Sequence, residues 1–400
     1  MFFESYHSFL IILLLVGLYH LAKSLWNNEI LKNAVLLFCS IVVLLTVINE
    51  HTLYCLLGLS GLIYFLGTLF SKKKPRIGFV VTILILIISY SIRSYPIIQK
   101  IIADSIIDFL NKPILSVQKI GLSYILFRMI HWLVDSYKGK IVNGSFLTFI
   151  NYILFFPSFI AGPIDTYNNF QFHLSKKSNK LDLRLFFSGV ARLFLGAFKT
   201  LVIVPLIIDV STDYTLLLSD YPPLLAITFS AICYSIYIYL DFSGYSDIAI
   251  GLGYLFSIKT PENFDSPYLA KNISDFWKRW HITFSNFLRL YVFGFLKGIS
   301  IRIFGAKKYF FVTVVLYLLT FLICGIWHGS TLNFVLWGLW HGIGISIYKL
   351  YDLYIYRNTN YSNSLIYKVL CVSITFLYVS FGWIFFHYSS QQLTEIFELL

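Results

Sequence analysis

Residues 79–90 read FVVTILILIISY, and this stretch decides the fold class. A helix built from it is apolar on every face, whereas a strand of a transmembrane β-barrel alternates apolar and polar positions. Crossing a hydrocarbon core of about 30 Å takes about 20 helical residues, and similar apolar runs recur along the whole chain. The sequence therefore predicts an all-α integral membrane protein that crosses the bilayer many times.

Composition supports this fold class. Hydrophobic residues make up 58% of the 400 residues and charged residues only 12%, whereas soluble domains carry about 25% charged residues. A water-soluble fold is excluded, and we expect about 11 spans plus short re-entrant or interfacial helices. The expected spans are 8–23, 31–48, 52–70, 78–96, 114–134, 146–164, 185–209, 222–241, 309–326, 331–351 and 366–387.

Two regions depart from simple spans. Residues 155–165 contain Pro157, Gly162 and Pro163 inside an apolar run, which predicts a broken or re-entrant segment. Residues 242–308 are interrupted by polar, Gly and Pro positions, and there we expect short helices buried in protein. The sequence has no internal repeat and no long polar segment, so we expect one polytopic membrane domain over residues 1–400.

Basic loops predict the orientation, because Lys and Arg are retained on the cytoplasmic side of a membrane. The run from Lys72 to Arg76 lies between two apolar segments. Counting spans from it puts Lys23 and Lys32 inside, and Glu50 and the N-terminus outside. Residues 9–22 lack a basic region before them and a cleavage site after them, so we expect a retained span.

The net charge of +12 is explained by basic loops that face anionic lipid, and no nucleic-acid motif is present. The sequence also has no HExxH zinc motif, no glycine-rich phosphate loop and no CxxC pair. We therefore expect no metal site and no tightly bound cofactor. The five cysteines are expected to be buried thiols: Cys39, Cys55, Cys233, Cys324 and Cys371.

Residues 272–289 have the apolar spacing of one helix face and predict an amphipathic helix. Lys278, Arg279 and Arg289 lie on its other side, where anionic lipid or a phosphate-bearing ligand is expected. His281 falls at the edge of the apolar stripe. A structural and a functional role for His281 are equally compatible with this pattern.

Two Trp-His-Gly triplets occur, at residues 327–329 and 340–342, and each lies at the border of an apolar run. An ionisable side chain at membrane depth is costly, which makes His328 and His341 functional candidates. Imidazole also suits proton transfer near neutral pH. If residues 328–341 formed one helix, the two rings would lie about 20 Å apart. The glycine after each histidine suits a tight turn or close approach of substrate, with close helix packing as the alternative.

Residues 239–247 place Asp241 and Asp247 in an apolar context. The segment Gly244-Tyr-Ser-Asp lacks the last glycine of a nucleophile elbow, which disfavours a serine hydrolase. We expect both carboxylates to orient other groups or accept backbone hydrogen bonds, with substrate contact as the alternative.

Taken in order, five segments resemble the membrane-bound O-acyltransferase family. The resemblance is to its bacterial branch, which contains the alginate O-acetyltransferase membrane subunit and the membrane protein of teichoic-acid D-alanylation. It covers residues 121–342. The segments are FPSFIAGPI from Phe156, DFSGYSDI from Asp241, PENFDSPY from Pro261, FWKRWH from Phe276 and WHG from Trp327.

The resemblance implies helices around a central funnel or tunnel, in a multi-pass protein of the bacterial plasma membrane. It implies transfer of an acetyl or D-alanyl group to hydroxyls of an exported polysaccharide or teichoic acid. The donor would be acetyl-CoA or a carrier-protein phosphopantetheine thioester on the cytoplasmic side. A separate extracytoplasmic transferase is a further expected partner.

His328 matches the essential histidine of the family and His281 its second characteristic polar position. The role of His341 stays open. Our remaining candidates for donor or substrate contacts are Lys278, Arg279, Arg289, Asp241 and Asp247.

Two departures from the family pattern stand out. The Arg-Asp pair usual after the amphipathic helix is Arg289-Leu290 here, and the Gly-Gly-Asn-Arg run of many alginate-type members is absent after Val292.

A transporter or flippase for a lipid-linked or acyl intermediate is the alternative function, because broken helices and buried charges suit it as well.

Overall fold

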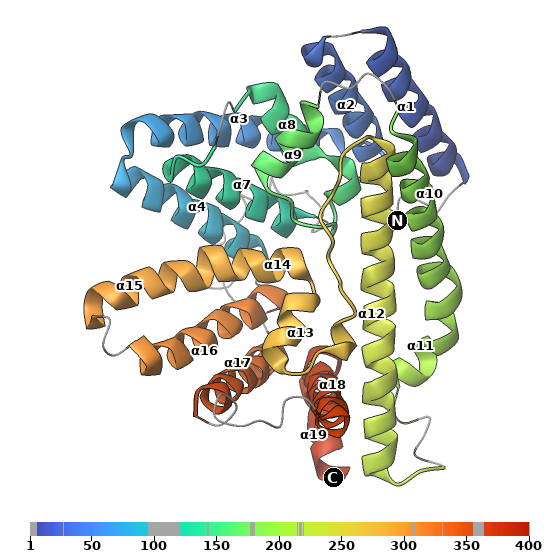
Figure 1. Cartoon of the computed structure of the whole chain (residues 1–400), viewed down its shortest axis with the longest axis vertical. Helices are drawn as coiled ribbons and strands as arrows, with labels where there is room; N and C mark the ends of the chain where they lie inside the picture. The colour runs from blue at the N-terminus through green and yellow to red at the C-terminus, as the bar shows by residue number, and fades with distance from the viewer. Residues whose placement is uncertain are drawn as a thin grey trace. The chain divides into compact units, whose positions relative to one another are not determined.

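The computed structural model describes residues 6–26, 28–94, 121–141, 144–176, 181–213, 215, 218, 220–305, 309–329, 331–354 and 364–399. Throughout these ranges the regular secondary structure is helical (Figure 1). The chain divides into two compact units, Met1–Leu195 with Tyr245–Pro261, and Gly196–Gly244 with Glu262–Leu400. The expected single membrane domain stays a prediction.

The helices that begin in the first unit are α1 (Tyr6–Leu25), α2 (Glu29–Leu44), α3 (Glu50–Lys73), α4 (Arg76–Ser94), α7 (Leu122–Tyr137), α8 (Phe146–Leu154), η1 (Phe156–Ser158), α9 (Tyr167–Leu174) and α10 (Leu183–Phe198). Those that begin in the second are η2 (Lys199–Ile203), α11 (Val204–Thr212), α12 (Pro223–Leu255), η4 (Pro267–Leu269), α13 (Ile273–Arg279), α14 (Ile282–Phe287), η5 (Leu288–Phe293), α15 (Gly294–Phe304), α16 (Tyr309–His328), α17 (Leu332–Tyr354), α18 (Leu365–His387) and α19 (Ser390–Leu399).

The helices have the length and surface of membrane spans. Within the described residues, four stretches are apolar and long enough to cross a bilayer: Glu50–Lys73, Leu183–Asp209, Pro223–Leu255 and Leu365–His387. Large apolar side chains also point outward, such as Ile77 and Leu206, which are 82% and 78% exposed. Water would make such surfaces costly, whereas lipid solvates them. The all-α membrane fold is therefore confirmed, and the number of spans stays a prediction.

Two boundaries differ from the expected ones. The span expected at 222–241 continues to Leu255, so α12 is one long helix (Figure 1). The short helices expected over 242–308 consequently begin only after Leu255, with η4, α13 and α14. The span expected at 146–164 is interrupted, because α8 ends at Leu154. The predicted break over residues 155–165 is confirmed. Residues 95–120, which hold part of the span expected at 114–134, lie outside the described residues.

Arg128 of α7 stabilises this break. In a continuous helix the carbonyl of Ile153 would accept a hydrogen bond from residue 157, which is proline and has no N–H. The Arg128 guanidinium donates instead to the carbonyls of Tyr152 and Ile153, at 2.9 and 3.0 Å. It also donates to the carbonyl and hydroxyl of Ser158. Arg128 is only 1% exposed, so its charge serves the backbone.

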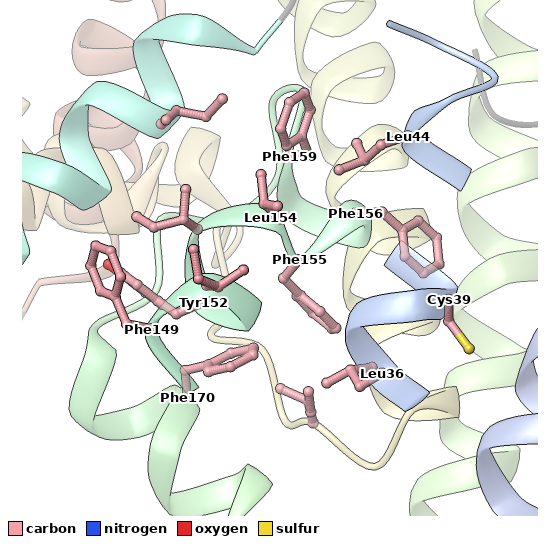
Figure 2. Close-up of a cluster of buried hydrophobic side chains, with 14 of the residues drawn as sticks. Leu36, Cys39, Leu44, Phe149, Tyr152, Leu154, Phe155, Phe156, Phe159 and Phe170 are labelled. Atoms are coloured by element: carbon pink, nitrogen blue, oxygen red, sulfur yellow. The ribbon is translucent and has the colours of Figure 1, made fainter. Parts of the chain in front are cut away.

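Around the break, aromatic side chains pack against α2 (Figure 2). The buried residues include Leu36, Cys39, Leu44, Phe149, Tyr152, Leu154, Phe155, Phe156, Phe159 and Phe170. All five cysteines are free thiols. Cys39 and Cys324 are buried as expected, and the other three are half-buried. The first unit thus has a core in which an irregular segment is enclosed by protein.

Candidate active site

The expected single helix over 272–289 is wrong, because the chain breaks within it. The Asn272 side chain accepts a hydrogen bond from the Asp275 N–H at 2.8 Å and caps α13. After Arg279, Trp280 is extended and His281 has φ +43°, in the left-handed region. That conformation is unfavourable for a residue with a Cβ and is typical of functional sites. α14 then begins at Ile282.

Asn263 holds the break in place. Its backbone carbonyl accepts a hydrogen bond from the Ile282 N–H at 2.9 Å. Its side-chain oxygen accepts from the backbone N–H and the hydroxyl of Thr283, and lies 3.0 Å from His281 Nδ1. A backbone N–H only donates, so this Asn263 atom is the acceptor oxygen. His281 Nδ1 therefore carries a proton, and Nε2 carries the lone pair of a neutral imidazole.

Burial keeps His281 neutral. Removal from solvent is the main cause that lowers its pKa to about 3, and nearby His328 contributes to this shift because two positive charges repel. The ring packs edge-on against Phe242 at 4.7 Å and lies over Phe284 at 5.0 Å. At neutral pH the imidazole is thus an uncharged base in an aromatic environment.

His328 is the last residue of α16, and α17 begins four residues later at Leu332. The helix is not continuous to His341, so the separation of about 20 Å does not apply. The indole of Trp337 contacts both imidazoles, with ring centroids 4.9 Å from His328 and 5.0 Å from His341. The turn between the two helices brings the two triplets together.

Glycines allow α16 and α17 to pack closely. A Cβ on Gly325 would clash with the Phe334 carbonyl, and one on Gly338 would clash with the Phe321 carbonyl. A Cβ on Gly342 would lie 3.2 Å from the Leu318 Cα. The glycine after His341 therefore serves close helix packing, which was the alternative to a tight turn or close approach of substrate.

His281 and His328 line one small cavity of about 60 Å³, which we call the histidine cavity. Its other walls are apolar or aromatic, so the imidazoles dominate its chemistry. The remaining lining residues are Ile238, Phe242, Trp277, Trp280, Phe284, Trp337, Trp383 and Phe386. His328 is half-buried and His281 is buried.

His341 does not line this cavity. It is fully buried, and among the described residues neither ring nitrogen has a hydrogen-bond partner. Its ring centroid lies 5.1 Å from that of Trp277 and 5.0 Å from that of Trp337, two cavity walls. The structure places His341 behind the walls of the histidine cavity.

The three basic candidates separate into two groups. Lys278 and Arg289 line a second cavity of about 420 Å³, which we call the cationic cavity, together with Lys349 of α17. Arg279 does not line it. The Arg279 guanidinium lies 3.0 Å from the carboxylate of Asp275 and 3.6 Å from that of Asp265.

The two acidic candidates lie in different units. Asp241 is half-buried on α12 in the second unit and lines neither cavity. Asp247 belongs to the first unit, where its buried carboxylate pairs with Arg192. On α12, Ile238 and Phe242 lie on either side of Asp241 in the sequence, and their side chains line the histidine cavity.

Sequence reasoning missed Asn263, the aromatic walls and Lys349. Asn263 lies within the PENFDSPY segment, so a motif signal existed without a role. Trp277 and Trp337 looked like ordinary packing residues. Lys349 lies eight residues after His341 and had no signal, because only the packing of α17 brings it to the cationic cavity.

Comparison with known proteins supports these motifs. Residues 78–391 match the model of the membrane-bound O-acyltransferase family. The chain is 36% identical to a peptidoglycan O-acetyltransferase of Helicobacter pylori, over 61% of this chain and 44% of that protein. It is 30% identical to a probable alginate O-acetylase of Pseudomonas fluorescens, over 67% and 50%. It is 29% identical to a teichoic acid D-alanyltransferase of Bacillus subtilis, over 67% and 68%.

The matched segment spans about half the length of the first two relatives. The family match covers most of this chain, extends over parts of both units and includes both histidines of the cavity. The chain belongs to the membrane-bound O-acyltransferase family.

Proposed function

We propose that this chain transfers a short acyl group from a thioester to a hydroxyl of a cell-envelope polymer, with His328 as general base. The observation that carries the proposal is the histidine cavity, where two imidazoles share a small space with apolar walls. Imidazole is the usual side chain for proton transfer near neutral pH. A cavity of about 60 Å³ suits an acetyl or D-alanyl group better than a long acyl chain.

In this mechanism His328 accepts the proton of the attacking hydroxyl while its oxygen adds to the thioester carbonyl. The tetrahedral intermediate collapses, the C–S bond breaks, and the thiolate takes the proton from His328. An ester and a free thiol result. In the alternative route, His281, held by Asn263 with its lone pair on Nε2, takes the same hydroxyl proton first and passes it to His328.

The oxyanion of the intermediate needs hydrogen-bond donors. The indole N–H groups of Trp277 and Trp337 are buried and have no acceptor within the described part of the chain. Both residues line the histidine cavity. A buried N–H without an acceptor is costly. An oxyanion that develops next to it and accepts a hydrogen bond from it is therefore stabilised. We assign oxyanion stabilisation to these indoles, because His281 in this tautomer has no proton on Nε2.

The protein is proposed to lie in the bacterial cytoplasmic membrane as a multi-pass protein with its N-terminus outside. Lys72 and Lys73 end α3, Lys74 caps it, and α4 starts at Arg76, so the basic run forms one short connection. We place this basic connection at the cytoplasm. The thioester donor, acetyl-CoA or an acylated carrier protein, is proposed to approach from the same side of the membrane. An extracytoplasmic transferase is a further proposed partner.

Replacement of His328 tests the proposal. Purified His328→Ala protein, incorporated into vesicles with a labelled acyl donor, should lose transfer to the polymer by at least about 100-fold. Helix content and monodispersity should match the wild type. If His328→Ala inserts normally and transfers at the wild-type rate, general-base catalysis by His328 is wrong. If purified wild-type protein moves an acyl carrier across the vesicle membrane but acylates no polymer, a transporter without chemistry is the better account.

The acyl group is tested in parallel with two donors, acetyl-CoA and D-alanyl carrier protein. Mass spectrometry of envelope polymers from cells with and without the chain should show the loss of one modification. Loss of acetyl groups assigns an O-acetyltransferase, and loss of D-alanyl esters assigns a D-alanyltransferase.

A further inference from the structure

Four polar side chains follow one face of α12. Ser230, Tyr234, Tyr237 and Asp241 are spaced by four, three and four residues, which puts them on the same side of a helix. All four belong to the second unit. α12 is one of the helices that are long and apolar enough to cross a membrane. We call these four residues the polar stripe.

The first half of the polar stripe is packed against α18. The hydroxyl of Ser230 lies 3.1 Å from that of Tyr388. The ring of Tyr234 lies against that of His387, with centroids 4.4 Å apart. His387 Nε2 in turn lies 3.0 Å from the carbonyl of Thr212, the last residue of α11. Ser230 and Tyr234 are buried, so this half of the stripe is engaged by protein.

Asp241, at the other end of the stripe, has a different environment. It is half-buried near the middle of α12, and no cation or hydrogen-bond donor in the described part of the chain compensates for this burial. Its carboxylate interacts electrostatically with Tyr234 and with Tyr237, which is half-buried. An ionisable side chain at membrane depth is costly and marks a functional site. Asp241 is therefore suited to a ligand whose groups donate hydrogen bonds.

The neighbours of Asp241 on α12 are walls of the histidine cavity. Ile238 lies three residues before it and Phe242 one residue after it, and both line that cavity. Residues three apart on a helix have Cβ atoms about 5–6 Å from each other. Asp241 itself lies outside the cavity, whose volume of about 60 Å³ suits a small acyl group. A ligand bound at Asp241 is thus beside the cavity rather than in it.

We propose that Asp241 and Tyr237 bind the acceptor, and that the acceptor segment at this site is an uncharged sugar or polyol. The inference rests on the proposed function, because it requires a hydroxyl that reaches His328. A sugar carries several hydroxyls, so one donates to Asp241 while a neighbouring one enters the histidine cavity. An ionised carboxylate accepts hydrogen bonds, has none to donate and repels another anion. The site therefore selects hydroxyls and disfavours a carboxylate or phosphate beside the reacting hydroxyl.

Binding without an acyl donor tests this site separately from the chemistry. The probes are cellotetraose, which is neutral, and the same tetramer oxidised at C6, which carries a carboxylate on each ring. The variants are Asp241→Asn and Tyr237→Phe, in nanodiscs. Asp209→Asn is the matched control, since Asp209 is an exposed carboxylate of α11 in the same unit and lines neither cavity. Helix content and thermal midpoint are measured for each variant.

We expect the wild type to bind cellotetraose about tenfold more tightly than the oxidised tetramer. Asp241→Asn should weaken cellotetraose binding about tenfold and abolish this preference, because the charged acceptor is lost. Tyr237→Phe should weaken binding about threefold. Asp209→Asn should bind both tetramers as the wild type does.

The proposal is overturned if the wild type binds both tetramers equally, or neither, or if folded Asp241→Asn protein keeps the wild-type preference. It is also overturned if Asp241→Asn loses only the binding of D-alanine methyl ester, because the carboxylate would then serve a cation. Transfer by His328→Ala at the wild-type rate, together with weakened cellotetraose binding in Asp241→Asn, would reject the proposed base and keep this site.

Discussion

The surroundings of Arg128 and of His281 show two uses of a buried ionisable side chain. Arg128 in the first unit donates to backbone carbonyls that a proline-broken helix leaves without partners. His281 in the second unit is held by Asn263 through Nδ1, and its ring lines a cavity. A cation surrounded by acceptors stabilises the chain's shape. An imidazole held at one nitrogen beside a cavity is placed for chemistry, and substitutions should separate these roles.

The largest expected effect is on stability, from Arg128→Met. Loss of the guanidinium leaves the carbonyls of Tyr152 and Ile153 buried without donors, which costs about 3 kcal/mol. The yield of monodisperse protein and the thermal midpoint should both fall. Arg184→Met is the control, since Arg184 is an exposed cation of the same unit. An Arg128→Met protein as stable as this control would contradict the backbone role.

On the other side of the comparison, Asn263→Ala should lower activity more than stability. Without the Asn263 oxygen, His281 loses its bond at Nδ1, and we expect kcat to fall about 100-fold through misorientation. Thr283→Val is the control, because it removes another bond to the same oxygen and leaves the imidazole contact. Equal loss of kcat in both variants would show that general disorder of the break, rather than the orientation of His281, is responsible.

Asp247→Asn tests a carboxylate that sequence patterns placed among the substrate contacts. The Asp247 side chain is buried and pairs with Arg192, which is about one-third exposed. Solvent screening at Arg192 limits the expected loss of stability to about 1 kcal/mol. The activity of the folded fraction should stay at the wild-type level. A fall in kcat without a fall in stability would return Asp247 to the substrate site.

Hydrophobic patterns predicted the helices well because lipid-facing segments must be apolar along their whole length, as in residues 79–90. They predicted the region around His281 poorly. The 3.6-residue period of 272–289 persists across the break, while the left-handed turn depends on Asn263, which is distant in sequence. His328 was found through its motif. Lys349 could not be found from the sequence, because its position in the cationic cavity depends on how α17 packs.

The smallest expected effect is a change in how stability depends on pH. Burial lowers the pKa of His281 to about 3 in the folded protein, against about 6.5 in the unfolded chain. The unfolded chain therefore binds more protons below pH 6.5, and folding stability falls as pH falls from there. Between pH 6 and pH 5, His281 should account for about 1 kcal/mol of the loss.

His281→Asn removes this contribution, and asparagine tolerates the left-handed conformation. Thermal midpoints measured at pH 6 and pH 5 should then differ less in the variant than in the wild type. Asn263→Ala provides the complementary measurement, since it keeps the imidazole and should retain most of the wild-type pH dependence. If His281→Asn and the wild type lose stability in parallel, the pKa of His281 is not lowered in the folded protein. In that case burial would not be what keeps His281 neutral, and the contrast with the enclosed cation Arg128 would be lost.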